Sequence, residues 1–200
     1  MKKGAEKYKA AATDDYSGAL PGKLLEENIA FFNGIFKKDS VLRQKKITVH
    51  GVYNYECALF YMDGMVDSEL ITESIVKPLL LVQNERTEGS FADYIKNQVL
   101  FASETKSTEN VADMLRAVLY GDTLLLDGCL TAITINTKGW RTRGISEPSD
   151  ERILQGPREG FDEAALLNVA MIRRKLLTPD LCTEMVRIGR RSDTIVFICY

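Results

Sequence analysis

The chain has 200 residues, of which 45% are hydrophobic and 27% are charged, and its net charge is only −2. This balance is typical of folded domains and excludes a chain that is disordered throughout. The excess of positive charge that a nucleic-acid-binding surface needs is missing, so no nucleic acid is expected as a partner. The four cysteines (Cys57, Cys129, Cys182 and Cys199) form no CxxC pair, and the only histidine is His50. Three of the cysteines lie in apolar strand or helix patterns, where we expect buried free thiols, and we expect no metal and no cofactor.

In the first half of the chain, the spacing of apolar residues predicts helices and strands in alternation. Residues 1–21 are small and charged without periodicity, and they predict a flexible tail. The expected elements are a helix over 24–38, strands over 45–50 and 55–62, a helix over 67–77 that ends at Pro78, a loop over 83–89 and a helix over 91–101.

In the second half, glycines and prolines mark the expected ends of the elements. Gly121 stands where a helix C-cap belongs, and Asp127-Gly128 suits the two-residue type I′ turn of a hairpin. The expected elements are a polar linker over 104–109, a helix over 111–119, strands over 123–126 and 130–137, an irregular stretch over 140–150, a helix over 162–177, a short helix from 179 to 188 and a strand from 194.

This order of elements predicts an α/β fold made of two small mixed α/β subdomains. The first is expected over 22–149 and the second over 150–200. The chain stops within an apolar, β-branched run, Thr194–Tyr200, with no turn or cap after it. We therefore expect the second subdomain to be truncated at the C-terminus. No segment reaches the roughly 20 apolar residues of a membrane span.

The most informative segment is a glycine- and proline-rich turn, 156–161, followed at once by the helix expected over 162–177. Projection at about 100° per residue places Arg173 within the apolar stripe of that helix, whereas Arg174 and Lys175 project outward. An arginine does not lose its proton, so in an apolar stripe it needs an acid, carbonyl groups or a bound anion. The pattern indicates a structural lock or an interaction surface and not a site of bond-making chemistry.

The same region resembles the A subunit of bacterial spore germinant receptors, the GerA family. The resemblance covers about residues 40–200 and its motifs occur in the family's order. They are Leu59–Asp67, Val76–Leu79, Asn136–Trp140, Ile145–Pro148, the run GPREGFDEAALLNVAMIRRKL beginning at Gly156, and Glu184–Ser192. The run from Gly156 with the arginine-rich helix is the specific part, and the Asp-Gly turns are weak signals.

The resemblance implies the soluble N-terminal domain of a larger receptor subunit that acts in nutrient-triggered germination through subunit assembly and signal transduction. It implies B and C subunits and other A subunits as partners, and oligomers that pass ions. It also implies membrane helices in segments that this chain lacks, and a location at the spore inner membrane with this domain on the cytosolic (core) side. A small nutrient ligand is implied as well.

Five residues are the candidates for an interface or a lock: Arg158, Glu159, Arg173, Arg174 and Trp140. Arg158 lies near the expected helix N-terminus, where it either binds an anion or pairs with an acid such as Glu159. Arg173 either binds an anion or holds a buried acid. Trp140 either stacks on Arg141 or Arg143, anchors an interface or packs in the core. The segment lacks the Gly-Lys-Ser/Thr ending of a P-loop, so nucleotide binding is not expected.

Other chemistry has weaker signals. Asp63, Asp67 and Asp127 either form a carboxylate or metal site or serve as two turn residues and a helix cap, and we expect the second arrangement. His50 has no motif partner for a catalytic triad, so no enzyme is expected. The alternative function is a small-ligand module that closes the cleft between two α/β units on an amino acid or sugar. An enzyme acting on a phosphorylated substrate is the third hypothesis.

Overall fold

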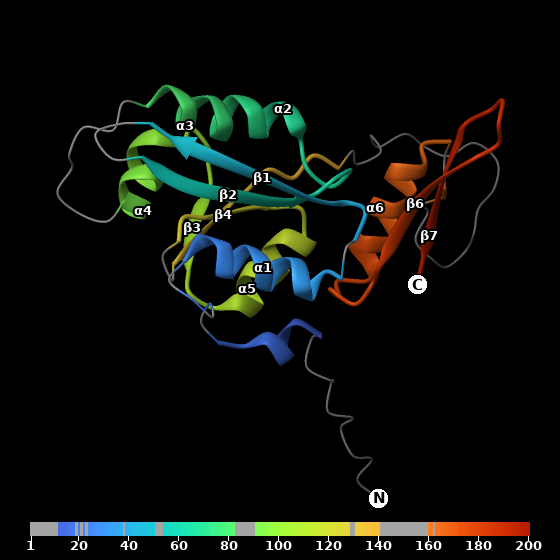
Figure 1. Cartoon of the computed structure of the whole chain (residues 1–200), viewed down its shortest axis with the longest axis horizontal. Helices are drawn as coiled ribbons and strands as arrows, with labels where there is room; N and C mark the ends of the chain where they lie inside the picture. Colours follow the sequence, from blue (N-terminus) through green and yellow to red (C-terminus); the bar gives the residue numbers. More distant parts are fainter. Residues whose placement is uncertain are drawn as a thin grey trace, which may run out of the picture.

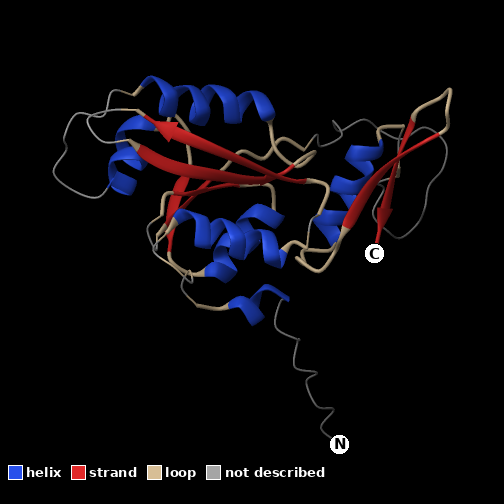
Figure 2. Ribbon diagram, viewed as in Figure 1, coloured by secondary structure: helices blue, strands red, loops and turns tan. Residues whose placement is uncertain are grey.

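The structure is a computed structural model of the chain, and it describes residues 12–18, 20, 22, 24–37, 39–50, 54–82, 91–128, 131–140, 160–161 and 163–200. These residues form two units, which lie side by side in Figures 1 and 2. The sheet unit comprises the described residues up to 140 and contains a five-stranded sheet. The hairpin unit comprises those from 160 on and contains one helix and a two-stranded sheet.

The sheet unit is built on five strands in the order β1-β2-β4-β5-β3, and every neighbouring pair is antiparallel. The strands are β1 (Leu42–Val49), β2 (Tyr55–Met62), β3 (Thr105–Thr108), β4 (Thr123–Leu126) and β5 (Ala132–Ile135). The expected α/β fold is confirmed, and β2 has the predicted bounds. The expected polar linker over 104–109 is wrong, because its central residues pair with β5 as the edge strand β3.

Helices cover both faces of this sheet (Figure 1). One face carries α1 (Leu25–Ile35) and α5 (Val111–Leu119), and the other carries α2 (Ser68–Ile71), the π-helical turn η2 (Thr72–Val76), α3 (Lys77–Leu81), α4 (Phe91–Tyr94) and the π-helical turn η3 (Ile95–Val99). Central strands are therefore apolar on both sides. In β2, Ala58 and Phe60 belong to the core cluster under α1 and α5, while Cys57 and Leu59 belong to the opposite cluster.

Part of the stretch expected as a tail packs against this unit. Residues Ala12–Tyr16 form the short 3₁₀ helix η1, and Thr13 is buried. The Arg116 Nε of α5 donates to Thr13 Oγ1 at 3.0 Å, and the Val111 N–H donates to the carbonyl oxygen of Gly18 at 2.8 Å. The sheet unit therefore includes packed residues that precede α1 in the sequence.

The helix predicted to end at Pro78 instead runs on through α2, η2 and α3 to Leu81. Proline has no N–H, so it leaves one carbonyl oxygen of the preceding turn without a donor. The structure satisfies that group from outside the helix, because the Phe101 N–H donates to the Ser74 carbonyl oxygen at 3.2 Å. The i→i−5 bond from the Lys77 N–H to the Thr72 carbonyl oxygen makes the turn before the proline π-helical.

The hairpin of β4 and β5 is confirmed, but its connection is longer than predicted. The register Leu125↔Ile133 and the strand ends at Leu126 and Ala132 leave five residues between the strands. Gly128 does take the left-handed conformation, with φ of +79°. A two-residue type I′ turn at Asp127-Gly128 is therefore wrong.

The hairpin unit consists of α6 (Ala165–Lys175), β6 (Thr183–Ile188) and β7 (Thr194–Cys199). The helix predicted to end at Ile188 is wrong, because these residues pair along their whole length with β7, from Thr183↔Cys199 to Ile188↔Thr194. Gly189, which follows the residues predicted as that helix, lies in the hairpin turn with φ of +94°. Figure 1 shows α6 beside this hairpin, on the side toward the sheet unit.

Candidate functional site

Arg173 of α6 lies where the two units meet. Its side chain is only 1% exposed, and its Nη2 forms an ion pair with Oδ2 of Asp39, whose side chain is fully buried. The same Nη2 donates to the Leu181 carbonyl oxygen at 2.8 Å. Asp39 lies in the connection between α1 and β1, so this pair joins the hairpin unit to the sheet unit.

Local backbone structure positions the carboxylate of Asp39. The Asp39 N–H donates to the Phe36 carbonyl oxygen at 2.9 Å, which closes a turn after α1. The Asp39 Oδ1 accepts a hydrogen bond from the Val41 N–H at 3.1 Å, a local side-chain-to-backbone bond typical of aspartate in turns. Oδ1 also accepts from the buried Thr183 hydroxyl of β6. The two carboxylate oxygens thus bind two different segments of the hairpin unit.

Further contacts reinforce the same connection, and together with Asp39–Arg173 they define the junction: Lys37, Asp39, Ser40, Arg173, Asp180, Leu181 and Thr183. The Ser40 N–H donates to the Thr183 carbonyl oxygen at 2.8 Å, and the two hydroxyl oxygens lie 3.3 Å apart. Lys37 pairs with Asp180 at 3.3 Å, but both side chains are about 60% exposed. That outer pair therefore contributes much less than the buried one.

The charge at the centre of the junction is retained at neutral pH. Burial lowers the pKa of Arg173 from 12.5 to about 10, which still leaves the guanidinium protonated. Its Nε and Nη1 have no hydrogen-bond partner among the described residues. The buried guanidinium depends on one carboxylate from the sheet unit and one carbonyl oxygen from the hairpin unit. Loss of either group should therefore weaken the junction.

A second set of contacts joins α6 to the sheet unit through an aromatic cluster. The Arg174 guanidinium lies over the Trp140 ring at 5.8 Å, and the Trp140 and Tyr120 rings meet edge-on at 5.1 Å. Lys138 lies over the Tyr120 ring at 5.2 Å and pairs with Asp122. The arginine over Trp140 is Arg174 of α6, whereas Arg141 and Arg143, the stacking partners that the sequence suggested, lie outside the described residues.

Of the five residues predicted for an interface or lock, the structure brings Trp140, Arg173 and Arg174 to the side of α6 that meets the sheet unit. Arg158 and Glu159 lie outside the described residues, so neither the anion site nor the ion pair expected there is placed. Asp39 and Thr183 are the functional candidates that sequence reasoning missed.

The aspartates considered for catalysis or metal binding have structural partners. The Asp67 Oδ1 accepts from the Glu69 and Leu70 N–H groups at 2.9 and 3.1 Å, which makes it the N-cap of α2 as predicted. Asp63 pairs with Arg43 at 2.7 Å. Across the described part of the chain, no group of three or more histidine, cysteine or acidic side chains is arranged to hold a metal ion.

The cysteines divide by position. Cys57 in β2 is buried, and burial raises the pKa of its thiol to about 12. Cys182 is also buried, but Cys199 in β7 is exposed, so the expectation of a buried thiol is wrong there. Cys129 lies outside the described residues. Within the described segments, none of the helices has the length and apolar character that crossing a bilayer demands.

Comparison with known proteins places this fold in a family. The family model of the Bacillus/Clostridium GerA spore germination protein matches residues 30–200. Spore germination protein KA of Bacillus subtilis (strain 168) is 30% identical over 164 residues, which make up 81% of this chain and 29% of that protein. The membrane protein YfkQ of the same organism is 27% identical over 143 residues, or 71% of this chain and 28% of that protein. The chain thus spans less than a third of the length of these relatives.

A solved structure shares the fold. The N-terminal domain of the A subunit of the Bacillus megaterium spore germinant receptor GerK3 matches with a TM-score of 0.63 and 23% identity, over 92% of this chain and 66% of that one. The family match extends from α1 through the junction to the end of β7, and it includes both units. The chain belongs to the Bacillus/Clostridium GerA spore germination protein family.

Proposed function

We propose that the chain is the N-terminal domain of a spore germinant receptor A subunit, and that it acts in nutrient-triggered germination through subunit assembly and signal transduction. The family membership and the fold shared with the GerK3 domain support this role. Relatives such as spore germination protein KA are named as germination proteins and not as enzymes, which supports a role without bond-making chemistry.

The junction is the observation that carries the mechanistic part of this proposal. A movement of the hairpin unit either displaces the α1–β1 connection with it or separates Arg173 from Asp39. Separation leaves two buried charges unpaired, which costs several kcal/mol. The pair therefore acts as the structural lock, and it couples the hairpin unit to the sheet unit as a rigid contact or as a contact with two discrete states.

The partners in this proposal are B and C receptor subunits and other A subunits, at the spore inner membrane with this domain on the core side. The membrane assignment draws support from the relative YfkQ, which is named a membrane protein, and from relatives more than three times as long as the matched segment. The hairpin unit offers exposed apolar side chains for assembly on both faces of its two-stranded sheet. By the strand register, Met185 and Ile195 lie on one face and Ile188 and Ile198 on the other, each more than 40% exposed.

The division of the chain near residue 150 belongs to the same proposal. The sheet unit holds two core clusters, whereas α6 contributes Val169 and Ala170 to the cluster under α1 and α5. The hairpin unit therefore has a separate two-stranded sheet, and its helix packs against the core of the sheet unit.

Germination of spores that carry substituted full-length protein tests the proposal. Arg173→Met should abolish or strongly slow the fall in optical density after nutrient addition, and immunoblotting measures how much of this destabilised variant accumulates. The matched control is Lys37→Gln, which removes the exposed ion pair of the same junction and should germinate normally. Arg173→Lys keeps the positive charge but loses the planar guanidinium group. This variant replaces Arg173→Met in the germination assay if the methionine variant does not accumulate.

Normal germination with Arg173→Met at a normal protein level would show that the junction transmits nothing. Normal germination after deletion of the whole gene, together with its receptor partners, would refute the receptor role itself. The two results are distinguishable, because the first concerns one contact and the second the entire protein.

A further inference from the structure

The hairpin unit repeats the first part of the sheet unit. α6 precedes β6 and contacts β7, just as α1 precedes β1 and contacts β2, and both helices have 11 residues. Five residues separate β1 from β2, and five separate β6 from β7. Both hairpins are antiparallel. The order helix, strand, turn and strand is therefore the same in the two units.

The strand registers of the two hairpins agree at a constant difference in residue number. The pair next to the turn is Val49↔Tyr55 in the first hairpin and Ile188↔Thr194 in the second, so each residue is shifted by 139 positions. The same shift places every pair of β6 and β7 on a pair of β1 and β2. Because side chains alternate between the two faces of a strand, equivalent positions lie on equivalent faces.

One pair of equivalent faces is apolar in both units but is buried in only one. In the sheet unit, four side chains that are at most 4% exposed form the face under α2-η2-α3: Ile47, Val49, Cys57 and Leu59. Their counterparts form the outer face of the hairpin unit, and all four are branched aliphatic side chains: Val186, Ile188, Val196 and Ile198. Ile188 is 55% and Ile198 is 47% exposed, and none of the four is buried by the described residues.

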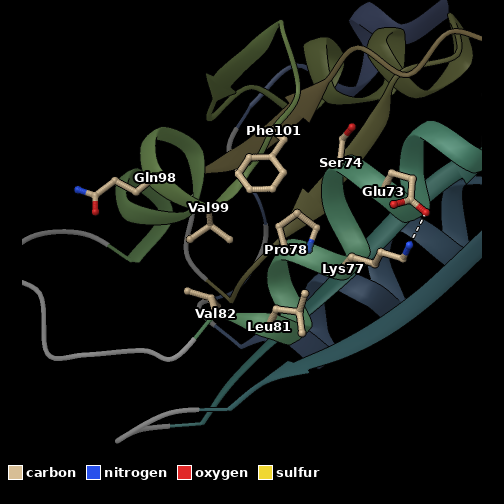
Figure 3. A pocket seen from close by; sticks show the side chains of 9 residues that line it. All are labelled: Glu73, Ser74, Lys77, Pro78, Leu81, Val82, Gln98, Val99 and Phe101. Carbon is tan, nitrogen blue, oxygen red and sulfur yellow. Dashed lines mark hydrogen bonds and ion pairs between the residues drawn. The ribbon is translucent and has the colours of Figure 1, made fainter.

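An amphipathic helix covers the equivalent face in the sheet unit. α2-η2-α3 contributes aliphatic side chains that recur every four residues to the core cluster of that face: Ile71, Ile75 and Leu79. Its other side is charged, since Lys77 and Glu73 form an ion pair with both side chains more than half exposed (Figure 3). Burial of apolar surface is the main source of stability in such a layer, so the outer face favours a helix of the same kind.

The opposite face of the β6–β7 hairpin is already packed. Phe197 packs against the core cluster under α1 and α5, to which α6 also belongs, and Thr183 is buried at the junction. The register places Phe197 and Thr183 on one face and the outer-face side chains on the other. A helix on the outer face would therefore displace neither α6 nor the junction.

We infer that an amphipathic helix binds the outer face of the β6–β7 hairpin, in the place that α2-η2-α3 takes on β1 and β2. The polypeptide that follows β7 in the longer protein supplies it, as α2 follows β2. The length of the relatives supports this source, because the matched segment is 29% of protein KA. The outer-face side chains are then internal contacts, and Met185 and Ile195 of the other face are left for assembly. The inference uses only the repeat and does not rest on the proposed receptor function.

Reaction of introduced thiols with a maleimide in the full-length protein tests the inference. Ile188→Cys probes the outer face, and Ile195→Cys is the matched control on the other face, where the counterpart Glu56 is exposed. Ile188→Cys should react at least tenfold more slowly than Ile195→Cys, because the counterpart Val49 is 0% exposed. In the 200-residue chain the two should react at similar rates, since Ile188 and Ile195 are 55% and 41% exposed. Mass spectrometry after digestion separates these thiols from the native cysteines.

A charge on the outer face gives an independent readout. Ile198→Asp should lower the Tm of the full-length protein but leave that of the 200-residue chain nearly unchanged, because there the side chain is already 47% exposed. Ile195→Asp is the control and should be tolerated in both proteins. An equal effect of Ile198→Asp in the two proteins would contradict the inference.

Three labelling results would also overturn it. Equal rates for the two thiols in the full-length protein would show that no helix covers the outer face. Slow labelling of Ile188→Cys already in the 200-residue chain would show that copies of the chain cover it. Slow labelling that requires another receptor subunit would show that the helix comes from that subunit. Germination is not measured here, so a failure of this inference is distinguishable from a failure of the receptor proposal.

Discussion

Replacement of Arg173 by methionine should destabilise the chain far more than the same replacement of Arg174. Methionine fills a similar volume but leaves the buried carboxylate of Asp39 without its cation. Removal of one partner of a buried ion pair costs about 3–5 kcal/mol. Arg174 makes a cation–π contact with Trp140 at 5.8 Å, and its loss should cost about 1 kcal/mol or less.

The burial of the pair places the expected cost in the upper part of that range. The side chains of Arg173 and Asp39 are 1% and 0% exposed, so water does not replace the lost partner. The Leu181 carbonyl oxygen loses its donor in the same variant. For a chain of this length 1 kcal/mol corresponds to roughly 2–4 °C in Tm, so the Arg173 variant should melt roughly 10 °C lower.

Urea unfolding followed by circular dichroism measures the free energies, and a double-mutant cycle isolates the pair. Asp39→Asn keeps an acceptor for the Val41 N–H but removes the charge. The double variant with Arg173→Met should therefore lose clearly less stability than the two single losses added together. Equal losses for the Arg173 and Arg174 variants, or strict additivity in the cycle, would refute this reasoning.

Three further predictions concern single side chains. Gly121→Ala should cost about 2 kcal/mol or more, because φ is +90° and the new Cβ would lie 2.8 Å from the Trp140 ring, whereas Gly34→Ala in open space on α1 should stabilise by about 0.5–1 kcal/mol. Equal thermal shifts for the two glycine variants would contradict the first. Iodoacetamide at pH 8 should modify exposed Cys199 and spare buried Cys57, as measured by mass spectrometry after digestion. Because burial raises the pKa of Cys57 from 9.0 to about 12, the stability due to its protonated thiol is complete below pH 9 and declines between pH 9 and 12, a slope that Cys57→Ala should remove.

Local patterns predicted the elements whose stability is local or whose burial is strong. The apolar run of β2 has its observed bounds, and α5 with Gly121 after it was placed correctly. The errors fall where a distant segment decides the structure. β3 is polar and becomes a strand only by pairing with β5, and β6 becomes a strand only by pairing with β7.

The proline error has the same origin. The rule that a helix ends before Pro78 assumes that the freed carbonyl oxygen finds no donor. The donor is the Phe101 N–H, which lies 27 positions beyond the Ser74 carbonyl oxygen in the numbering and which no pattern near Pro78 indicates.

Of the two residues of the buried ion pair, the sequence predicted Arg173 but not Asp39. Arg173 was identified because a permanent charge within an apolar stripe demands a partner. Asp39 was not, because the chain has 28 acidic residues and nothing near Asp39 distinguishes it from the others. The distinguishing property is burial, which depends on the packing of both units.

The sequence separation across the junction has a consequence for how the molecule folds. Ser40 and Thr183 are 143 residues apart, and Asp39 and Thr183 are 144 residues apart. The strands of the five-stranded sheet, in contrast, pair only with other strands of the sheet unit. During synthesis the sheet unit can therefore be complete, with the Asp39 carboxylate still hydrated, before α6 and its hairpin have emerged. Docking of the hairpin unit is then a late step that removes water from a charge already fixed in place by the Val41 N–H, and refolding should show it as a phase separate from formation of the sheet.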